Sequence, residues 1–232
     1  MAITTLNVKI HENTKVAQPY FPRARKKTSR ALVGDISPRI VTVIGGGVAG
    51  TEAISKAVAN NAFVKVIDLS KDKLVELEAR FGNQNIEYIL SSPQNIQDAI
   101  AISDLVIGAV YVIGKEAPKI VTLDMLKAMR PGTVMVDISI DQGGCFESSK
   151  PTTHDNPTFL VDGVLHYCVT NMPGAVPLTA TEALNRETLP YILELANKGI
   201  EVALDENIHL KNGLNTQDGK IMHPAVDEAL NK

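Results

Sequence analysis

Apolar and polar residues follow two alternating patterns between residues 39 and 139. Short runs rich in Val and Ile, each of strand length, alternate with longer segments in which apolar residues recur every three or four positions, as on one face of a helix. The predicted strands cover residues 39–45, 63–69, 86–90, 104–110 and 133–139. The predicted helices cover residues 48–60, 70–82, 92–103 and 121–129.

Strands with nearly continuous Val and Ile runs, joined by crossover helices, are typical of a parallel sheet that is covered on both faces. The pattern therefore predicts an α/β fold, a Rossmann-type doubly wound parallel sheet with helices on both faces. The alternation of predicted strands and helices ends near residue 140. A polar segment (141–157) is followed there by two strand-like pieces around Asp162 and Gly163, and then by a turn at 170–177.

The two ends of the chain differ from this central part. A long helix is predicted at 178–199 and a second at 223–232, with loops between them. Before residue 39 only "TTLNVKI" resembles a short strand. We therefore expect three parts: an N-terminal arm or substrate-domain remnant (1–38), a dinucleotide-binding domain (39–177) and a C-terminal helical segment (178–232).

Charge and composition exclude several classes of protein. Among 232 residues the net charge is −3, so no global field attracts nucleic acid or anionic membranes. The basic cluster "PRARKKTSR" (22–30) is expected to be a solvated arm or linker rather than a nucleic-acid patch. No apolar run approaches the roughly 20 residues of a membrane span, and no signal peptide is visible, so we expect a cytoplasmic protein. Cys145 and Cys168 fit no disulfide scaffold or metal spacing, and no metal site is predicted.

Three glycines follow the first predicted strand in the stretch "VTVIGGGVAGTEAI". Gly45, Gly47 and Gly50 have the spacing G-x-G-x-x-G, between a strand and a helix, as dinucleotide binding requires. Gly45 permits a tight turn, Gly47 lets the backbone approach a pyrophosphate, and Gly50 lets the helix pack on the strand. The amide groups at the start of the helix then face the anion.

Asp68 ends the second predicted strand, where an acidic residue meets the adenosine ribose in such folds. A carboxylate there accepts hydrogen bonds from the ribose hydroxyls and repels a 2′-phosphate, so NAD is favoured over NADP. Lys73 is close enough in sequence to soften that preference. The alternative is that Asp68 is only a turn residue at a strand end, which its position makes the weaker of the two interpretations.

Candidate catalytic residues lie at the end of the fifth predicted strand, with Asp137 inside it and Asp141 just past it. Asp141 either faces the reactive end of the cofactor, holding an ammonium group or orienting a water, or caps the following turn, and the residues alone leave both open. His154 and His166 each suggest a general base. We expect both to be structural histidines, one in a polar loop and one in an apolar strand.

Five segments together resemble the C-terminal part of the alanine dehydrogenase family: "VIGGGVAGT", "DLVIGAV", "VDISIDQGGCFESSKPTTHDNP", "HYCVTNMPGAVP" and "TLPYILELANKG". Several of them distinguish it from the related proton-pumping transhydrogenase subunit. The resemblance implies reversible oxidative deamination of L-alanine to pyruvate and ammonia with NAD. It implies a catalytic role for Asp141 and contacts to the cofactor from Gly45, Gly47, Val48, Gly50, Asp68, Lys73, Ser91, Val110, Ile138, Asn171 and Met172.

This chain also departs from the pattern of the family that it resembles. The family places a substrate domain ahead of its dinucleotide domain, with a catalytic histidine that nothing in this chain matches, whereas only 39 residues precede the fold here. We therefore expect NADH binding but little or no alanine turnover by this chain alone. We also expect the apolar C-terminal helices to be covered by a second copy or a partner chain. The alternatives are a non-catalytic NAD(H)-binding module and a structural remnant that binds no cofactor.

Overall fold

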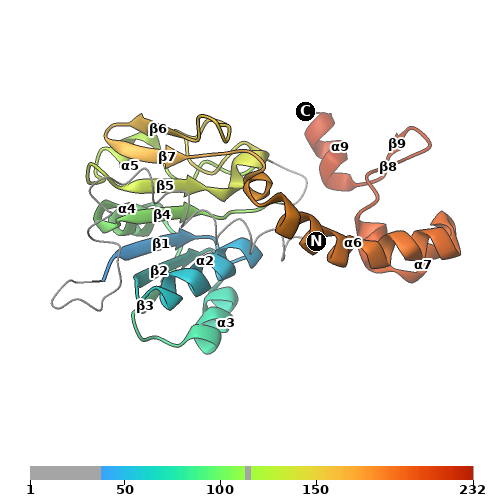
Figure 1. Cartoon of the computed structure of the whole chain (residues 1–232), viewed down its shortest axis with the longest axis horizontal. Coiled ribbons are helices and arrows are strands. Elements are labelled where there is room, and N and C mark those ends of the chain that lie inside the picture. Colours follow the sequence, from blue (N-terminus) through green and yellow to red (C-terminus); the bar gives the residue numbers. More distant parts are fainter. Residues whose placement is uncertain (1–37, 113–115, 232) are drawn as a thin grey trace.

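The computed structural model describes residues 38–112 and 116–231, and the expected N-terminal strand and basic cluster lie outside them. Its centre is a seven-stranded sheet with the strand order β3-β2-β1-β4-β5-β7-β6 (Figure 1). The strands are β1 (Ile40–Ile44), β2 (Phe63–Asp68), β3 (Ile86–Leu90), β4 (Leu105–Gly108), β5 (Val134–Asp137), β6 (Thr158–Val161) and β7 (Val164–Tyr167). All neighbours are parallel except β6, which pairs antiparallel with β7 at the edge.

Four helices connect the parallel strands: α2 (Val48–Ala59), α3 (Lys71–Phe81), α4 (Pro93–Ile102) and α5 (Leu123–Leu126). One apolar cluster joins the inner residues of α2 and α3 to one face of the sheet, among them Ile54 and Leu77. A second cluster joins α4 and α5 to the other face through Ile100 and Leu126. Because both faces are buried, the strands need apolar residues at nearly every position, which confirms the predicted doubly wound α/β fold.

Several predicted elements are shorter in the structure, and two of them have a clear local cause. The helix predicted over 121–129 is only α5, because residues 127–129 donate to carbonyls three residues back, a tighter turn than an α-helix, just before Pro131 and Gly132. The strand predicted over 133–139 ends at Asp137, whose side chain accepts from the amide of Ser139 and starts a 3-10 helix, η3 (Ile138–Gln142).

The C-terminal part contains more structure than the predicted loops. After the 3-10 helix η4 (Met172–Ala175), helix α6 (Pro177–Lys198) leads away from the sheet (Figure 1). It is followed by α7 (Ile200–Glu206), α8 (Ile208–Asn212), a hairpin of β8 (Thr216–Gln217) and β9 (Lys220–Ile221), and α9 (Pro224–Leu230). None of the helices in the described ranges is both long enough and apolar enough to cross a membrane.

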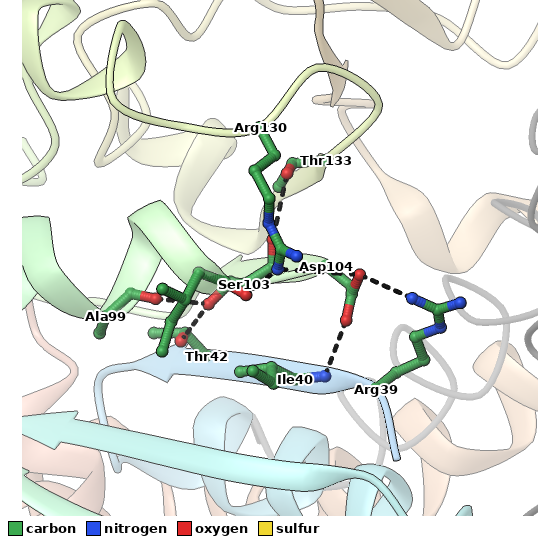
Figure 2. A network of polar contacts seen from close by, with 9 residues as sticks. Arg39, Ile40, Thr42, Ala99, Ser103, Asp104, Arg130 and Thr133 are labelled. Carbon is green, nitrogen blue, oxygen red and sulfur yellow. Dashed lines mark hydrogen bonds and ion pairs between the residues drawn. The ribbon is translucent and has the colours of Figure 1, made fainter. Parts of the chain in front are cut away.

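A polar network ties together the starts of the central strands, at the amino edge of the sheet (Figure 2). Asp104, just before β4, accepts from the Ile40 amide at 3.0 Å and pairs with the Arg39 guanidinium at 3.1 Å. The buried Ser103 hydroxyl donates to the Ala99 carbonyl, so it accepts from Thr42 at 2.6 Å. This network pairs polar groups where the strands begin. The glycine turn lies at the opposite, carboxyl edge of the sheet.

Candidate functional site

The glycine turn between β1 and α2 is too tight for side chains at two positions. Gly45 has φ +100°, and a Cβ built on it would lie 2.5 Å from the Ala109 carbonyl oxygen. A Cβ on Gly50 would lie 1.7 Å from the Gly45 carbonyl oxygen. Both glycines are therefore required for the close approach of α2 to the ends of β1 and β4.

Gly47 differs from these two, because a Cβ built on it would meet nothing within 4 Å. Packing within the chain therefore does not explain a glycine at this position. Gly47 is the N-cap of α2, and its position leaves the first turn of the helix without a side-chain cap. An open space at a helix start with no side-chain acceptor suits the approach of an anionic group to the backbone.

Asp68 is bonded directly to this turn. Its Oδ2 accepts from the amide of Gly46 at 2.7 Å, and its Oδ1 accepts from the amide of Ser70 at 2.8 Å. A carboxylate has about four acceptor positions, so two bonds leave capacity for the hydroxyls of a ribose. The side chain of Lys73 lies beside the turn, with Cγ 3.2 Å from a Cβ built on Gly46, and its ammonium pairs with Glu76.

Ser91 lies beside Asp68 at the same edge, because its amide donates to the Asp68 carbonyl at 2.8 Å. The predicted ribose and adenine residues Asp68, Lys73 and Ser91 are thus brought together with the glycine turn. They lie at the carboxyl ends of β1, β2 and β3, where ligands bind in open α/β sheets.

The loops after β4 and β5 are joined to each other. The Ser139 hydroxyl donates to the Val110 carbonyl at 2.7 Å, and the Gln142 side-chain amide donates to the Val112 carbonyl at 3.1 Å. Two of the predicted nicotinamide-side residues, Val110 and Ile138, therefore lie on loops that are held against each other. Ile138 is almost completely buried, whereas Val110 is partly exposed.

Asp141 lies on the exposed side of η3 and contacts the loop after β7. Its Oδ1 accepts from the amide of Asn171 at 3.4 Å. Asn171 has the left-handed φ of +51°, and its carbonyl accepts from the Gly174 amide at 2.8 Å and from His154 Nε2 at 3.2 Å. The predicted residues Asp141 and Asn171 thus meet, and His154 supports the same turn from a polar loop. Met172, next in the chain, is buried.

His166 is fully buried in β7, and its ring stacks on that of Phe159 with centroids 4.9 Å apart. Nδ1 lies 3.0 Å from the Val164 carbonyl oxygen and therefore carries the hydrogen, so Nε2 accepts from the Ser148 hydroxyl at 2.7 Å. Burial lowers the pKa of His166 and keeps the ring neutral. These contacts make His166 a structural residue with both nitrogens occupied.

Both cysteines are free and buried near the end of β5. Burial and, secondarily, the nearby Asp137 carboxylate raise the pKa of the Cys145 thiol well above its usual range. The same two causes, in the same order, raise the pKa of Cys168 to about 12. Protonated, buried thiols are poor nucleophiles and poor metal ligands. The described residues contain no group of three or more His, Cys, Asp or Glu side chains that could hold a metal ion.

A family described as "Alanine dehydrogenase/PNT, C-terminal domain" matches residues 16–224, most of the chain. The chain belongs to the alanine dehydrogenase/PNT family. The alanine dehydrogenase of Halomonas elongata is 50% identical over 197 residues, which are 85% of this chain and 53% of that protein. The alanine dehydrogenase of Bacillus subtilis is 49% identical over 206 residues, 88% of this chain and 54% of that protein. The chain therefore spans about half the length of these relatives.

Two solved structures share the fold. An L-alanine dehydrogenase structure superposes with a TM-score of 0.81 and 41% identity, covering 99% of this chain and 64% of that one. The transhydrogenase from Sinorhizobium meliloti superposes with a TM-score of 0.73 over 97% of this chain and 61% of that one. Its 24% identity supports the fold alone.

The cofactor of this domain of the alanine dehydrogenase/PNT family is NAD. The residues of this chain fit NAD, because the space beside Gly47 is open to the backbone and the Asp68 carboxylate is held next to it. When bound, NAD⁺ supplies a hydride acceptor at its nicotinamide carbon.

Several residues that organise this edge were not singled out by sequence reasoning. Ser139 and Gln142 connect two loops through bonds to backbone carbonyls, and such bonds leave no regular signal in a single sequence. Asp137 was noted only as a residue near a strand end. A fully buried aspartate at the end of an apolar strand is unusual enough to mark the position as one with many hydrogen-bond donors.

Proposed function

We propose that this chain is the NAD(H)-binding part of an enzyme that oxidatively deaminates L-alanine to pyruvate and ammonium, and that runs this reaction in reverse. The observation that carries the proposal is the pairing of an open glycine turn with the bonded Asp68 carboxylate. The family membership and the roughly 50% identity to alanine dehydrogenases support it.

The proposed reaction balances with water as the co-reactant. A hydride leaves Cα of alanine for the nicotinamide, the amine loses a proton, and the resulting imine is hydrolysed to pyruvate and ammonium. Gly45, Gly47, Val48 and Gly50 line the pyrophosphate, which is held by backbone amides at the start of α2. The Gly45 amide itself donates to the Ile67 carbonyl, so Gly45 only shapes the turn. Asp68 binds the adenosine ribose. Lys73 and Ser91 act on the adenine side, and Val110, Ile138, Asn171 and Met172 act beside the nicotinamide.

Asp141 is proposed to act on the reacting atoms. A carboxylate at the carboxyl edge of β5 can hold the ammonium group of alanine or orient the water that attacks the imine. Its contact with Asn171 supports this proposal, because that bond fixes one carboxylate oxygen beside the turn that carries Met172.

The test follows NADH absorbance after addition of pyruvate and ammonium. The unchanged chain is compared with Asp141→Asn and with a matched control, Asp162→Asn. Asp162 has a φ of +49° in the β6–β7 turn, a conformation that asparagine adopts readily. All three should bind NADH, and any NADH loss that the unchanged chain supports should persist in the control and be absent from Asp141→Asn.

Turnover by Asp141→Asn at the control rate would remove Asp141 from the catalytic role. NADH binding without any turnover by the unchanged chain would favour the second candidate, a non-catalytic NAD(H)-binding module. That candidate shares the glycine turn and the Asp68 carboxylate with the first, so turnover is what separates the two.

We also propose that residues 178–232 form a separate helical part, distinct from the dinucleotide domain at 39–177, whose apolar side is covered by a second copy or by a partner chain. Residues from α6, α7 and α8 line a hollow of about 720 Å³. Large apolar side chains on these three helices are exposed, among them Leu189, Ile192, Leu193, Ile200 and Ile208. Exposed apolar surface of this extent is typical of an interaction site.

Sedimentation at concentrations on the order of 10 µM tests the self-association arm of this proposal. We expect an assembly that Ile192→Glu weakens and that Val75→Glu leaves intact, because Val75 is as exposed as Ile192 but lies on α3. A monodisperse monomer of the unchanged chain would contradict self-association.

A further inference from the structure

One carboxylate at the end of β5 accepts hydrogen bonds from several residues of the loop that follows it. Asp137 is fully buried. Its Oδ1 accepts from the Ser139 amide at 3.0 Å, and the Cys145 thiol lies 3.5 Å from the same oxygen. Its Oδ2 accepts from the amides of Cys145 and Phe146, at 2.8 and 3.4 Å, and from the Ser149 hydroxyl at 2.5 Å.

These donors come from both ends of the loop that runs from Ile138 to Ser149, and all are uncharged groups. The loop also lies directly on the carboxylate. Gly144 has φ +80°, and a Cβ on it would be 2.7 Å from Asp137 Oδ2 and 2.8 Å from Ser149 Cβ. From the other side, the Lys119 ammonium donates to the carbonyls of Gly143 and Gly144. The path of the loop is therefore set by Asp137 on one side and, on the other, by bonds to residues 117–121.

The loop held in this way carries residues assigned above to the nicotinamide end of the site. Ser139, bonded to Asp137, holds the Val110 carbonyl through its hydroxyl. Asp141, two residues further along, contacts Asn171 on the third loop. A change at Asp137 thus reaches the loops after β4, β5 and β7, whereas the donors to Asp137 come from residues 139–149 and not from the glycine turn or the residues around Asp68.

We infer that Asp137 is a positioning residue that sets the nicotinamide half of the cofactor site through the Ile138–Ser149 loop, without touching the cofactor. This inference rests on the proposed function. The inference predicts that the nicotinamide contacts depend on Asp137. The pyrophosphate and ribose contacts do not depend on it.

The decisive variant is Asp137→Asn, which keeps the size of the side chain. Each oxygen of Asp137 faces at least two donors, so the amide nitrogen of asparagine meets donors in either orientation. The matched control is Asp104→Asn. Asp104 also accepts from a backbone amide in this sheet, but at the amino edge (Figure 2). Both variants lose a carboxylate, and only one loses it at the site.

Two ligands separate the halves of the site. ADP-ribose lacks the nicotinamide and reports the pyrophosphate and ribose contacts, whereas the nicotinamide emission of bound NADH reports the other half. We expect ADP-ribose affinity to stay within about twofold in both variants, since its contacts are untouched. The enhancement of NADH emission should be retained by Asp104→Asn and lost by Asp137→Asn, with any hydride transfer falling on the order of 100-fold.

Wild-type NADH emission on Asp137→Asn, or an equal loss of ADP-ribose and NADH binding, would overturn the positioning role alone. Absence of NADH binding to the unchanged chain would instead overturn the proposed function, and the positioning role with it. If Asp137→Asn does not fold, Ser149→Ala decides the matter, because it removes one donor to the same oxygen and keeps the carboxylate. A partial loss of emission supports the role, and unchanged emission overturns it.

Discussion

The amide of Gly46 lies 2.7 Å from Oδ2 of Asp68 and donates a hydrogen bond to it. The bond joins the turn proposed to hold the pyrophosphate to the carboxylate proposed to hold the ribose. Two neighbouring parts of one ligand are thus matched by two directly bonded parts of the chain. Pre-positioning of this kind lowers the entropic cost of binding.

Asp68→Asn should weaken NADH binding by about tenfold or more, because a charged acceptor of ribose hydroxyls is lost. The amide nitrogen also faces the donor of either Gly46 or Ser70. NADPH binding should suffer less, since the charge that repels a 2′-phosphate is removed. Titrations of both nucleotides measure the change, and an unaltered NADH to NADPH preference would remove Asp68 from the ribose site.

Two alanine substitutions in the glycine turn should have opposite effects. Gly50→Ala should destabilise the fold by about 3 kcal/mol or more, because its Cβ would overlap the Gly45 carbonyl oxygen. Gly47→Ala should change the free energy of unfolding by no more than about 1 kcal/mol, since its Cβ meets open space. The same Gly47 variant should weaken NADH binding more than about tenfold, because the methyl group takes the space of the pyrophosphate.

Urea unfolding and NADH titration of the two variants check this pair. If Gly47→Ala bound NADH as tightly as the unchanged chain, the open space beside α2 would not be the pyrophosphate site. A Gly50→Ala variant of unchanged stability would mean that the close contact between α2 and the turn is not required.

His166 should make the fold less stable as the pH falls below its ordinary pKa of 6.5. Burial lowers the folded-state pKa, so below pH 6.5 the unfolded chain binds a proton that the folded chain does not. This contribution is complete above pH 6.5 and is lost as the pH falls toward the folded-state value. His166→Gln should therefore show a smaller drop in the free energy of unfolding between about pH 7.5 and 5.5 than the unchanged chain. Equal drops would contradict the buried neutral ring, and exposed His209→Gln serves as the control.

Both thiols should resist a disulfide reagent at about pH 8 until the chain unfolds, because only thiolates react and burial raises both pKa values. Reagent absorbance followed in native buffer and in denaturant measures this. Rapid reaction of either cysteine in native buffer would show that the end of β5 opens readily.

The sheet and its first three helices could be predicted because the signals are local. Continuous Val and Ile runs mark doubly buried strands, and the serine caps at Ser70 and Ser92 mark where α3 and α4 begin. The glycine turn was predictable for the same reason, since its chemistry depends on spacing within six residues. Asp68 followed from its distance to that turn.

The rest of the site depends on contacts that are remote in sequence. Asp137 ends β5 early because donors from residues 139–149 surround it, and periodicity carries no information about such donors. Asn171 meets Asp141 across 30 positions. The sequence predicts loops where α7 and α8 lie, because Gly199 and Asn207 interrupt the apolar pattern, although Asn207 caps α8 with its side chain.

Titration of the unchanged chain with NADH, followed by its fluorescence, tests the central claim most directly. The bonded turn and carboxylate predict a saturable rise in nicotinamide emission that ADP-ribose reverses by competition. No change in emission at any NADH concentration, or a change that ADP-ribose does not reverse, would contradict dinucleotide binding at the glycine turn.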